Sequence, residues 1–353
     1  MTTIINVRSP YIVEINEVGQ SNSKVELFIW NGSGGAPASP TYTLSKNVPS
    51  PTKVQTVYNI SHYVQEYINH NSISVVYNTI TPTPNSHWCN VRIKKYSNGT
   101  LIDAYDVFAV NGYGQYNDGY NPQLNYALID QMTYYYPYNS TYDLATYPLV
   151  RPSMFTVFAY NSFYVRWTNL VTGDTHDNAL TPDQFTNLFT VYPLYADSGN
   201  HVVVYDGDDE IVSEFTMRPI DECKYTPIAV DYVNRYGAWQ RQHFFKASFD
   251  SIDVKGDEFN LLQSNLVNYD VMEGQRKVFN KNGTDKITVN SGFVGDDFAN
   301  IMQQILLSER ILVDGKPAIC NTSTLDKQKQ LNTKLINYSV EFNFAYDTIN
   351  SVV

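Results

Sequence analysis

The chain has 353 residues, which is too long for one ordinary domain and fits two or three. Hydrophobic residues make up 43% of it, which excludes bulk disorder, and a net charge of −11 argues against a basic surface for binding nucleic acid. The 29 Tyr and 17 Phe suit half-buried pleated surfaces, so we expect a mainly β protein in which some tyrosines form contact surfaces.

Residues 1–112 are expected to form a β-sandwich with one inserted helix. Val25, Leu27 and Ile29 alternate with their neighbours at the two-residue period of a strand. Asn98-Gly99 predicts a tight hairpin between the strands that flank it. The inserted helix is indicated by apolar residues at helical spacing: Ile60, Tyr63, Val64, Tyr67 and Ile68.

Residues 113–148 lose this periodicity and are rich in Gly, Asn, Pro and Tyr, which is typical of a linker or an extended arm. An aromatic arm gains free energy by burying its rings in a groove, so the segment is a candidate for wrapping a neighbouring subunit. A long loop folded back over its own domain is an equally open alternative. The possible assembly arm consists of Tyr113, Tyr116, Tyr120, Tyr134, Tyr135, Tyr136 and Tyr138.

Residues 149–222 are expected to form a second β-sandwich-like domain. Asp206-Gly207 predicts a hairpin between two apolar runs. A short helix is predicted from Thr181, with Pro182 at its first position and Gln184 completing a capping box. The apolar face of that helix would consist of Phe185, Leu188 and Phe189.

Residues 223–353 are expected to form a C-terminal mixed β/α domain. Tyr236-Gly237 and Asn282-Gly283 each predict a turn between paired strands. Asp296-Asp297 predicts the start of a helix, because two acidic side chains complement the helix dipole there. A final long strand is indicated by alternating apolar residues: Tyr338, Val340, Phe342, Phe344 and Tyr346.

The sequence contains few motifs that are typical of catalytic sites. Its six His and three Cys have no metal-binding spacing, and neither a nucleophile elbow nor a phosphate-cradling loop is present. We therefore assign no catalytic, cofactor-binding or metal-ligating residues and expect reduced thiols. The acidic cluster from Asp206 to Glu210 is interpreted as a solvated hairpin tip, with cation binding left open. Stacking of sugar rings on aromatic side chains is also left open. Trp239 is the tryptophan whose exposure the sequence does not settle.

Three regions of the chain resemble structural tail, collar or ring proteins of bacteriophages that infect Bacteroidetes, including the crAss-like group. The first region is YNISHYVQEYI at 58–68. The second contains CKYTPI at 223–228, YVNRYGAW at 232–239 and FFK at 244–246. The third contains LLSER at 306–310 and INYSVEF at 336–342.

This resemblance implies a non-enzymatic virion component, made in the host cytoplasm and placed in the tail or neck region. It implies a ring of identical copies around the DNA exit channel, next to the portal and other ring or tail proteins. An acidic lumen would let DNA pass without sequence-specific binding. A receptor- or glycan-binding tail module is the alternative, and a glycan-active enzyme is a third hypothesis. The sequence shows neither a secretory signal nor an apolar run long enough for a membrane span, so no membrane partner is expected.

Overall fold

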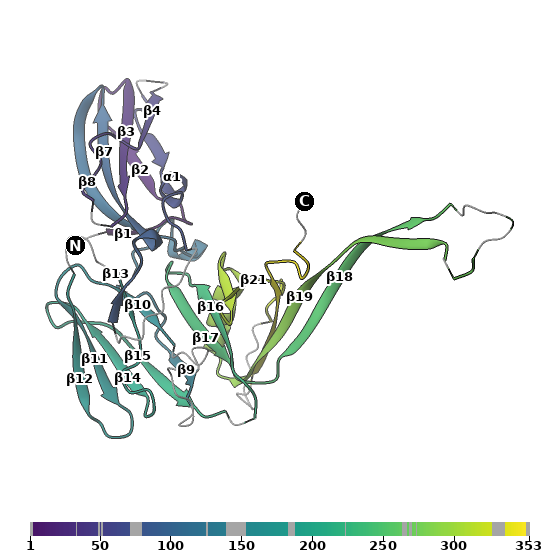
Figure 1. Ribbon diagram of the computed structural model, residues 1–353. Helices are drawn as coiled ribbons and strands as arrows, with labels where there is room; N and C mark the ends of the chain where they lie inside the picture. Colours follow the sequence, from purple (N-terminus) through teal and green to yellow (C-terminus); the bar gives the residue numbers. More distant parts are fainter. Residues whose placement is uncertain are drawn as a thin grey trace.

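The computed structural model confirms the expected mainly β fold with few helices (Figure 1). Its described strands form several sheets, and a small helix packs in the C-terminal unit. The structure describes residues 3–32, 34–48, 50, 52–70, 80–124, 126–138, 153–182, 188–222, 224–262, 267, 270–272, 274–326 and 336–350.

The N-terminal unit is a sandwich of a five-stranded sheet, in the order β1-β8-β7-β3-β4, against the pair β2-β5. Val25, Leu27 and Ile29 lie in its core, which confirms the predicted alternation. Asn98 and Gly99 have φ of 48° and 82°, as the tight turn between β7 and β8 requires. The strands are β1 (Thr3–Asn6), β2 (Ile12–Ile15), β3 (Asn22–Trp30), β4 (Tyr42–Asn47), β5 (Thr56–Asn59), β7 (Trp88–Ser97) and β8 (Thr100–Val110).

The predicted inserted helix is present but shorter than expected. Helix α1 spans Ser61–Gln65 and buries Val64 in the sandwich core, while Tyr67 and Ile68 pack against that core beyond the end of the helix. Two single-turn 3₁₀ helices, η1 (Asn85–His87) and η2 (Tyr116–Asp118), lie in the connections that follow.

The middle unit combines a five-stranded sheet, β12-β11-β14-β15-β9, with a three-stranded sheet, β10-β13-β6. The predicted hairpin across Asp206-Gly207 is confirmed by the antiparallel pairing of β14 with β15. The strands are β6 (Ile80–Pro82), β9 (Thr133–Pro137), β10 (Phe155–Phe158), β11 (Phe163–Asn169), β12 (Thr175–Leu180), β13 (Leu188–Val191), β14 (Asn200–Tyr205) and β15 (Ile211–Ile220).

The short helix predicted from Thr181 is wrong at its last residues, Leu188 and Phe189. Leu188 and Phe189 belong to strand β13, which pairs with β10 on one side and β6 on the other. Pairing on both sides satisfies the backbone of this strand in the sheet, and that outweighs the local capping pattern. Thr181 and Pro182 follow the end of β12 and have no helical assignment, and residues 183–187 lie outside the described part of the chain.

The C-terminal unit is a seven-stranded sheet in the order β17-β16-β20-β21-β22-β19-β18. Helix α2 (Phe298–Leu306) begins after Asp297, as predicted, and buries Ile301, Met302 and Ile305. The predicted turn at Tyr236-Gly237 is confirmed, and so is the final strand up to Phe344, whereas Tyr346 lies beyond its end. The strands are β16 (Ile228–Val233), β17 (Trp239–Phe244), β18 (Phe249–Asn260), β19 (Arg276–Val294), β20 (Ile311–Val313), β21 (Lys316–Cys320) and β22 (Ile336–Phe344).

The N-terminal, middle and C-terminal units are joined by shared hydrophobic cores. One core runs continuously from the middle unit into the C-terminal sheet. A second core joins Trp88 and Phe108 of the N-terminal sandwich to Leu128, Phe158 and Tyr236. The N-terminal, middle and C-terminal units therefore meet as one body, from which a single long element projects (Figure 1).

Candidate assembly surface: the projecting hairpin

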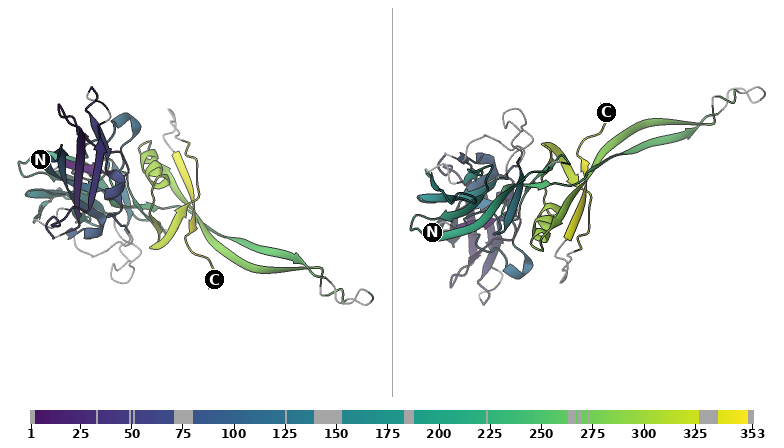
Figure 2. Two further views of the ribbon diagram at one scale, coloured as in Figure 1. Left: turned by 90° about the horizontal axis from the view of Figure 1, so that it is seen from above. Right: turned by 90° about the horizontal axis from the view of Figure 1, so that it is seen from below.

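Strands β18 and β19 form a long antiparallel hairpin that points away from the body in each view (Figures 1 and 2). Every one of the 12 residues of β18 is exposed, as are the first residues of β19. The later part of β19 continues into the sheet, where it pairs with β22, and the start of β18 forms the edge of that sheet. The distal part of the hairpin is thus a two-stranded ribbon with solvent on both faces. We call this element the projecting hairpin.

The hairpin bends at a β-bulge. Between Asp257 and Lys255 the register shifts, because β19 has one more residue than β18 at this point. Asn280 provides the left-handed backbone conformation, with φ of 52°. Opposite it, a Cβ at Gly256 would lie 3.1 Å from the Lys281 side chain, so glycine suits this close approach. The bulge therefore directs the outer part of the hairpin on a different course from its base.

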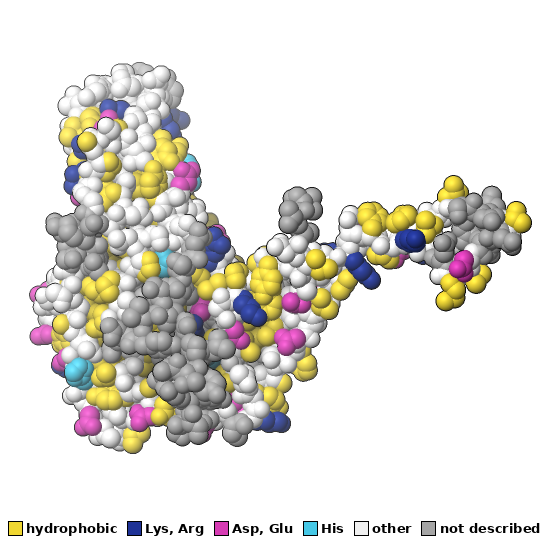
Figure 3. All heavy atoms as spheres, in the orientation of Figure 1, with side chains coloured by type: hydrophobic (Ala, Val, Ile, Leu, Met, Phe, Trp, Pro, Cys, Tyr) yellow, Lys and Arg dark blue, Asp and Glu magenta, His cyan; other side chains and the backbone are white. Residues whose placement is uncertain are grey.

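Apolar side chains occupy both ends of this exposed ribbon. Ile252 and Val254 near the base are 53% and 50% exposed, and Phe259 and Phe279 farther out pack edge to face with ring centroids 5.5 Å apart. Figure 3 shows apolar side chains along the shaft and near its end. A two-stranded hairpin is marginally stable in water, and contiguous exposed apolar surface marks contact sites. The hairpin therefore has the properties of an interaction element.

Ion pairs on the hairpin do little to fix it. Lys286 lies 3.5 Å from Asp253, and Arg276 lies 4.0 Å from Glu258. Exposed pairs of this kind contribute roughly 0–1 kcal/mol. The ion pairs therefore contribute little to the stability of the hairpin.

The predicted turn at Asn282-Gly283 is wrong, because both residues lie inside β19, opposite Lys255 and Val254. Asn282 instead fixes the C-terminal segment: its Nδ2 donates to the carbonyl of Ile349 at 2.9 Å, and its Oδ1 accepts from the Ile349 N–H at 2.9 Å. The carbonyl of Gly283 accepts from the N–H of Thr348 at 2.7 Å. Asn282 and Gly283 thus hold the C-terminal segment against β19. The connection between β18 and β19 runs through residues 261–275.

Two of the seven tyrosines of the predicted arm are part of the core. Tyr134 and Tyr136 lie in β9, are each 1% exposed, and belong to the core that the middle and C-terminal units share. Their hydroxyls donate to main-chain carbonyls, Tyr134 to Asp130 at 2.8 Å and Tyr136 to Ala196 at 2.8 Å. For these two tyrosines the arm prediction is wrong, because β9 pairs with β15 of the same chain.

The other five tyrosines of that set have mixed environments. Tyr116 and Tyr120 are 99% and 76% exposed, and Tyr135 is 38% exposed. Tyr113 is partly buried beneath the Arg8 guanidinium, 4.9 Å from its ring centroid, and burial raises its pKa. Tyr138 is also partly buried, against the shared core. The structure therefore does not bring the seven together in one arm.

The acidic cluster closes its own hairpin turn. Asp206 Oδ1 accepts from the N–H groups of Asp208 at 2.9 Å and Glu210 at 3.0 Å. Asp209 Oδ1 accepts from the hydroxyl of Tyr164 at 2.9 Å. Within the described residues, no three His, Cys, Asp or Glu side chains gather closely enough to hold a metal ion. These contacts give the cluster a structural role in the turn.

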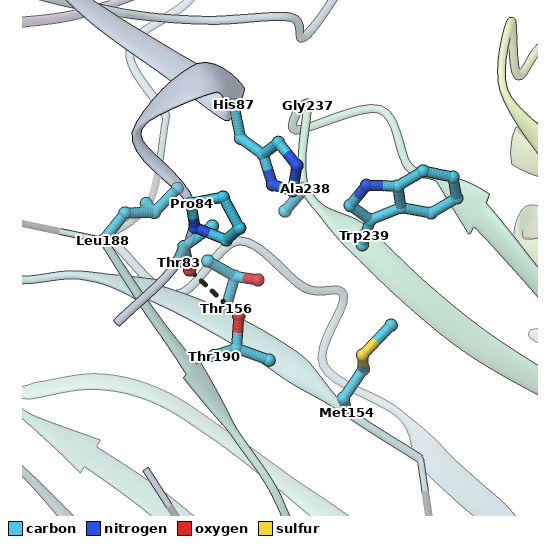
Figure 4. A pocket seen from close by; sticks show the side chains of 10 residues that line it. All are labelled: Thr83, Pro84, His87, Met154, Thr156, Leu188, Thr190, Gly237, Ala238 and Trp239. Carbon is cyan, nitrogen blue, oxygen red and sulfur yellow. Dashed lines mark hydrogen bonds between the residues drawn. The ribbon is translucent and has the colours of Figure 1, made fainter. Parts of the chain in front are cut away.

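The tryptophans offer little surface for stacking. Trp88 and Trp167 are fully buried, Trp239 is 6% exposed, and Trp30 is partly buried. Trp239, whose exposure the sequence left open, faces a hollow at the junction of the three units (Figure 4). That hollow has a volume of about 10 Å³, which is room for roughly one water molecule. It is a packing seam and too small for a sugar.

A buried histidine joins the N-terminal region to the C-terminal sheet at this seam. His70 is 3% exposed, its Nε2 lies 3.0 Å from the carbonyl of Gly237, and its ring stacks on His87 with centroids 4.8 Å apart. Burial, with a smaller contribution from the neighbouring His87, lowers the pKa of His70 to about 3. The ring is therefore neutral near pH 7.

Comparison with known proteins adds little. No family model and no curated protein matches the chain. Among solved structures, the CupB2 chaperone of Pseudomonas aeruginosa aligns with 69% of this chain and 96% of its own, at 8% identity and a TM-score of 0.18. A similarity this weak supports no conclusion about fold or function. Within the described part of the chain, no helix has the length and apolar character to cross a membrane.

Proposed function

We propose that this chain is a structural protein of a tailed bacteriophage particle, a ring, collar or tail adaptor that acts through protein contacts and performs no catalysis. The observation that carries the proposal is the projecting hairpin, whose outer strand is exposed along all 12 residues and carries half-exposed Ile252, Val254 and Phe259. An element of this kind gains free energy when another polypeptide covers it.

The rest of the molecule is consistent with a role as a rigid building block. Shared cores hold the three units together, so the hairpin is presented at a defined position. The net charge of −11 would repel DNA phosphates, as suits a ring through which DNA slides without being bound. In this proposal the partners are further copies of the chain and neighbouring portal, ring or tail proteins.

The test compares the full chain with a shortened variant in which residues 256–281 are replaced by Asn-Gly. Lys255 and Asn282 face each other directly, so a two-residue turn can join them and keep the base of the hairpin. Mass photometry and electron microscopy should show ordered oligomers for the full chain and monomers for the variant. The thermal midpoint should change by less than about 2 °C, because the removed part buries little surface.

A matched control tests the tyrosine arm against the hairpin. The double variant Tyr116→Ala/Tyr120→Ala removes the two most exposed tyrosines of the predicted arm and should assemble like the full chain. Normal assembly of the shortened variant would refute the proposal. Loss of assembly in the tyrosine variant would instead assign the assembly contact to residues 113–148.

A further inference from the structure

The body has a hollow beside the base of the projecting hairpin, and both aromatic and polar side chains line it. Its volume is about 500 Å³, and β9, β15, β17, β19 and α2 contribute residues to its lining. Phe245, Phe293 and Phe298 supply aromatic wall, and Phe293 is 71% exposed although it lies at the inner end of β19. The rim carries an ion pair in which Lys246 Nζ donates to Glu222 Oε2 at 2.7 Å. We call this cavity the base hollow.

The outer end of the hairpin carries highly exposed aliphatic side chains. Leu262, Val267, Val271 and Met272 are 91%, 89%, 78% and 88% exposed. The 12 residues of β18 span about 40 Å at the usual rise of a strand, and the hollow lies at the opposite end of that strand. In this structure the tip of the hairpin therefore lies far from the base hollow of its own molecule.

We propose that the tip of the projecting hairpin of one copy binds in the base hollow of a second copy. This inference rests on the proposed function and specifies the partner of its assembly surface. One chain carries an apolar projection and a cavity with aromatic walls that do not meet within the molecule, so head-to-tail contact between copies would cover both. Such a contact joins two different faces and, when repeated, closes a ring or extends a filament.

Polar groups at the two sites suit this docking. Lys246 stays 46% exposed at the rim despite its bond to Glu222, and Asp270 is an exposed acid beside the aliphatic tip. A carboxylate that approaches the rim would meet this ammonium group. Met272 adds an adaptable side chain of the kind that fills irregular apolar cavities. The apolar contact supplies the affinity and the charges set the orientation.

A disulfide trap tests the contact directly. Met272→Cys protein is mixed with Phe293→Cys protein under mild oxidation, and linked peptides are identified by mass spectrometry. We expect a disulfide between the two introduced thiols, joining the tip of one molecule to the hollow of another. Its yield should be at least roughly tenfold above that formed with the control Val18→Cys, which is fully exposed on the N-terminal unit. A yield equal to that of the control, or a preferred link between two tips, would overturn the inference.

Assembly measurements give a second test that does not depend on oxidation. Met272→Asp and Phe293→Asp should each weaken self-association by at least roughly tenfold. Mixing the two variants should give dimers that grow no further, because one intact tip meets one intact hollow. If both variants assemble normally while the 256–281 replacement does not, the hairpin binds elsewhere and only this inference fails. If that replacement also assembles, the proposed function fails as well.

Discussion

Strands β9 and β18 are each the edge strand of a sheet, yet their surroundings are opposite. In β9, Tyr134 and Tyr136 are buried, since the strand pairs with β15 and lies against β17 of the neighbouring sheet. In β18 all side chains are exposed, because the strand runs beyond the body and no described part of the chain covers it. Exposure is thus set by what lies beside an edge strand, and a high content of aromatic residues does not reveal it.

The largest expected effect tests the buried side of this comparison. Tyr134→Ala should lower the free energy of unfolding by about 3–5 kcal/mol, because it leaves a cavity in the shared core. Tyr116→Ala, at a position 99% exposed, should change it by less than about 0.5 kcal/mol. Denaturant unfolding of both variants measures the difference. Equal effects would mean that β9 is not part of the cooperative core.

An intermediate effect concerns the pH dependence of the body that holds β9. The His70 pKa falls from 6.5 in the unfolded chain to about 3 in the fold, so the unfolded state binds the proton more readily. The resulting stability is present above pH 6.5 and declines as the pH falls toward 3, by up to about 1.4 kcal/mol per pH unit.

The measurement is the free energy of unfolding at several pH values. His70→Gln should make the free energy of unfolding depend less on pH between 3 and 6.5 than it does in the unchanged chain. The exposed His62→Gln serves as the matched control and should leave this pH dependence as it is. The shortened hairpin variant should keep the full slope, since His70 lies in the body. Identical slopes for the two histidine variants would show that the seam does not hold His70 neutral.

Local patterns predicted the parts of the fold that depend on local geometry. Asn98-Gly99 and Asp206-Gly207 form the expected turns, and apolar alternation marks β22 because one of its faces is buried. The projecting hairpin escaped detection because neither face of β18 is buried, so its residues follow no hydrophobic period. Its signal was the mixed sequence of Phe249–Asn260, where charged and apolar residues alternate without a consistent side.

The failed predictions depended on contacts between residues distant in the sequence. Asn282-Gly283 has turn composition, but its polar groups bind Ile349 and Thr348, which lie close to the end of the chain. Tyr136 can be buried because Ala196 supplies an acceptor for its hydroxyl. Neither partner is visible in a local window. The base hollow likewise draws on five separate elements, and no motif in the sequence marks it.

The smallest expected effect tests the exposed side of the comparison. Phe259→Ser removes an aromatic side chain of a size similar to Tyr134, but from a two-stranded ribbon where its ring is 43% exposed and contacts Phe279. The hairpin can open locally without unfolding the body, so the global free energy of unfolding should change by less than about 0.5 kcal/mol. Hydrogen exchange should quicken only along β18 and outer β19. A loss as large as that of Tyr134→Ala would mean that the hairpin and β9 belong to one cooperative unit, and the contrast between the two edge strands would disappear.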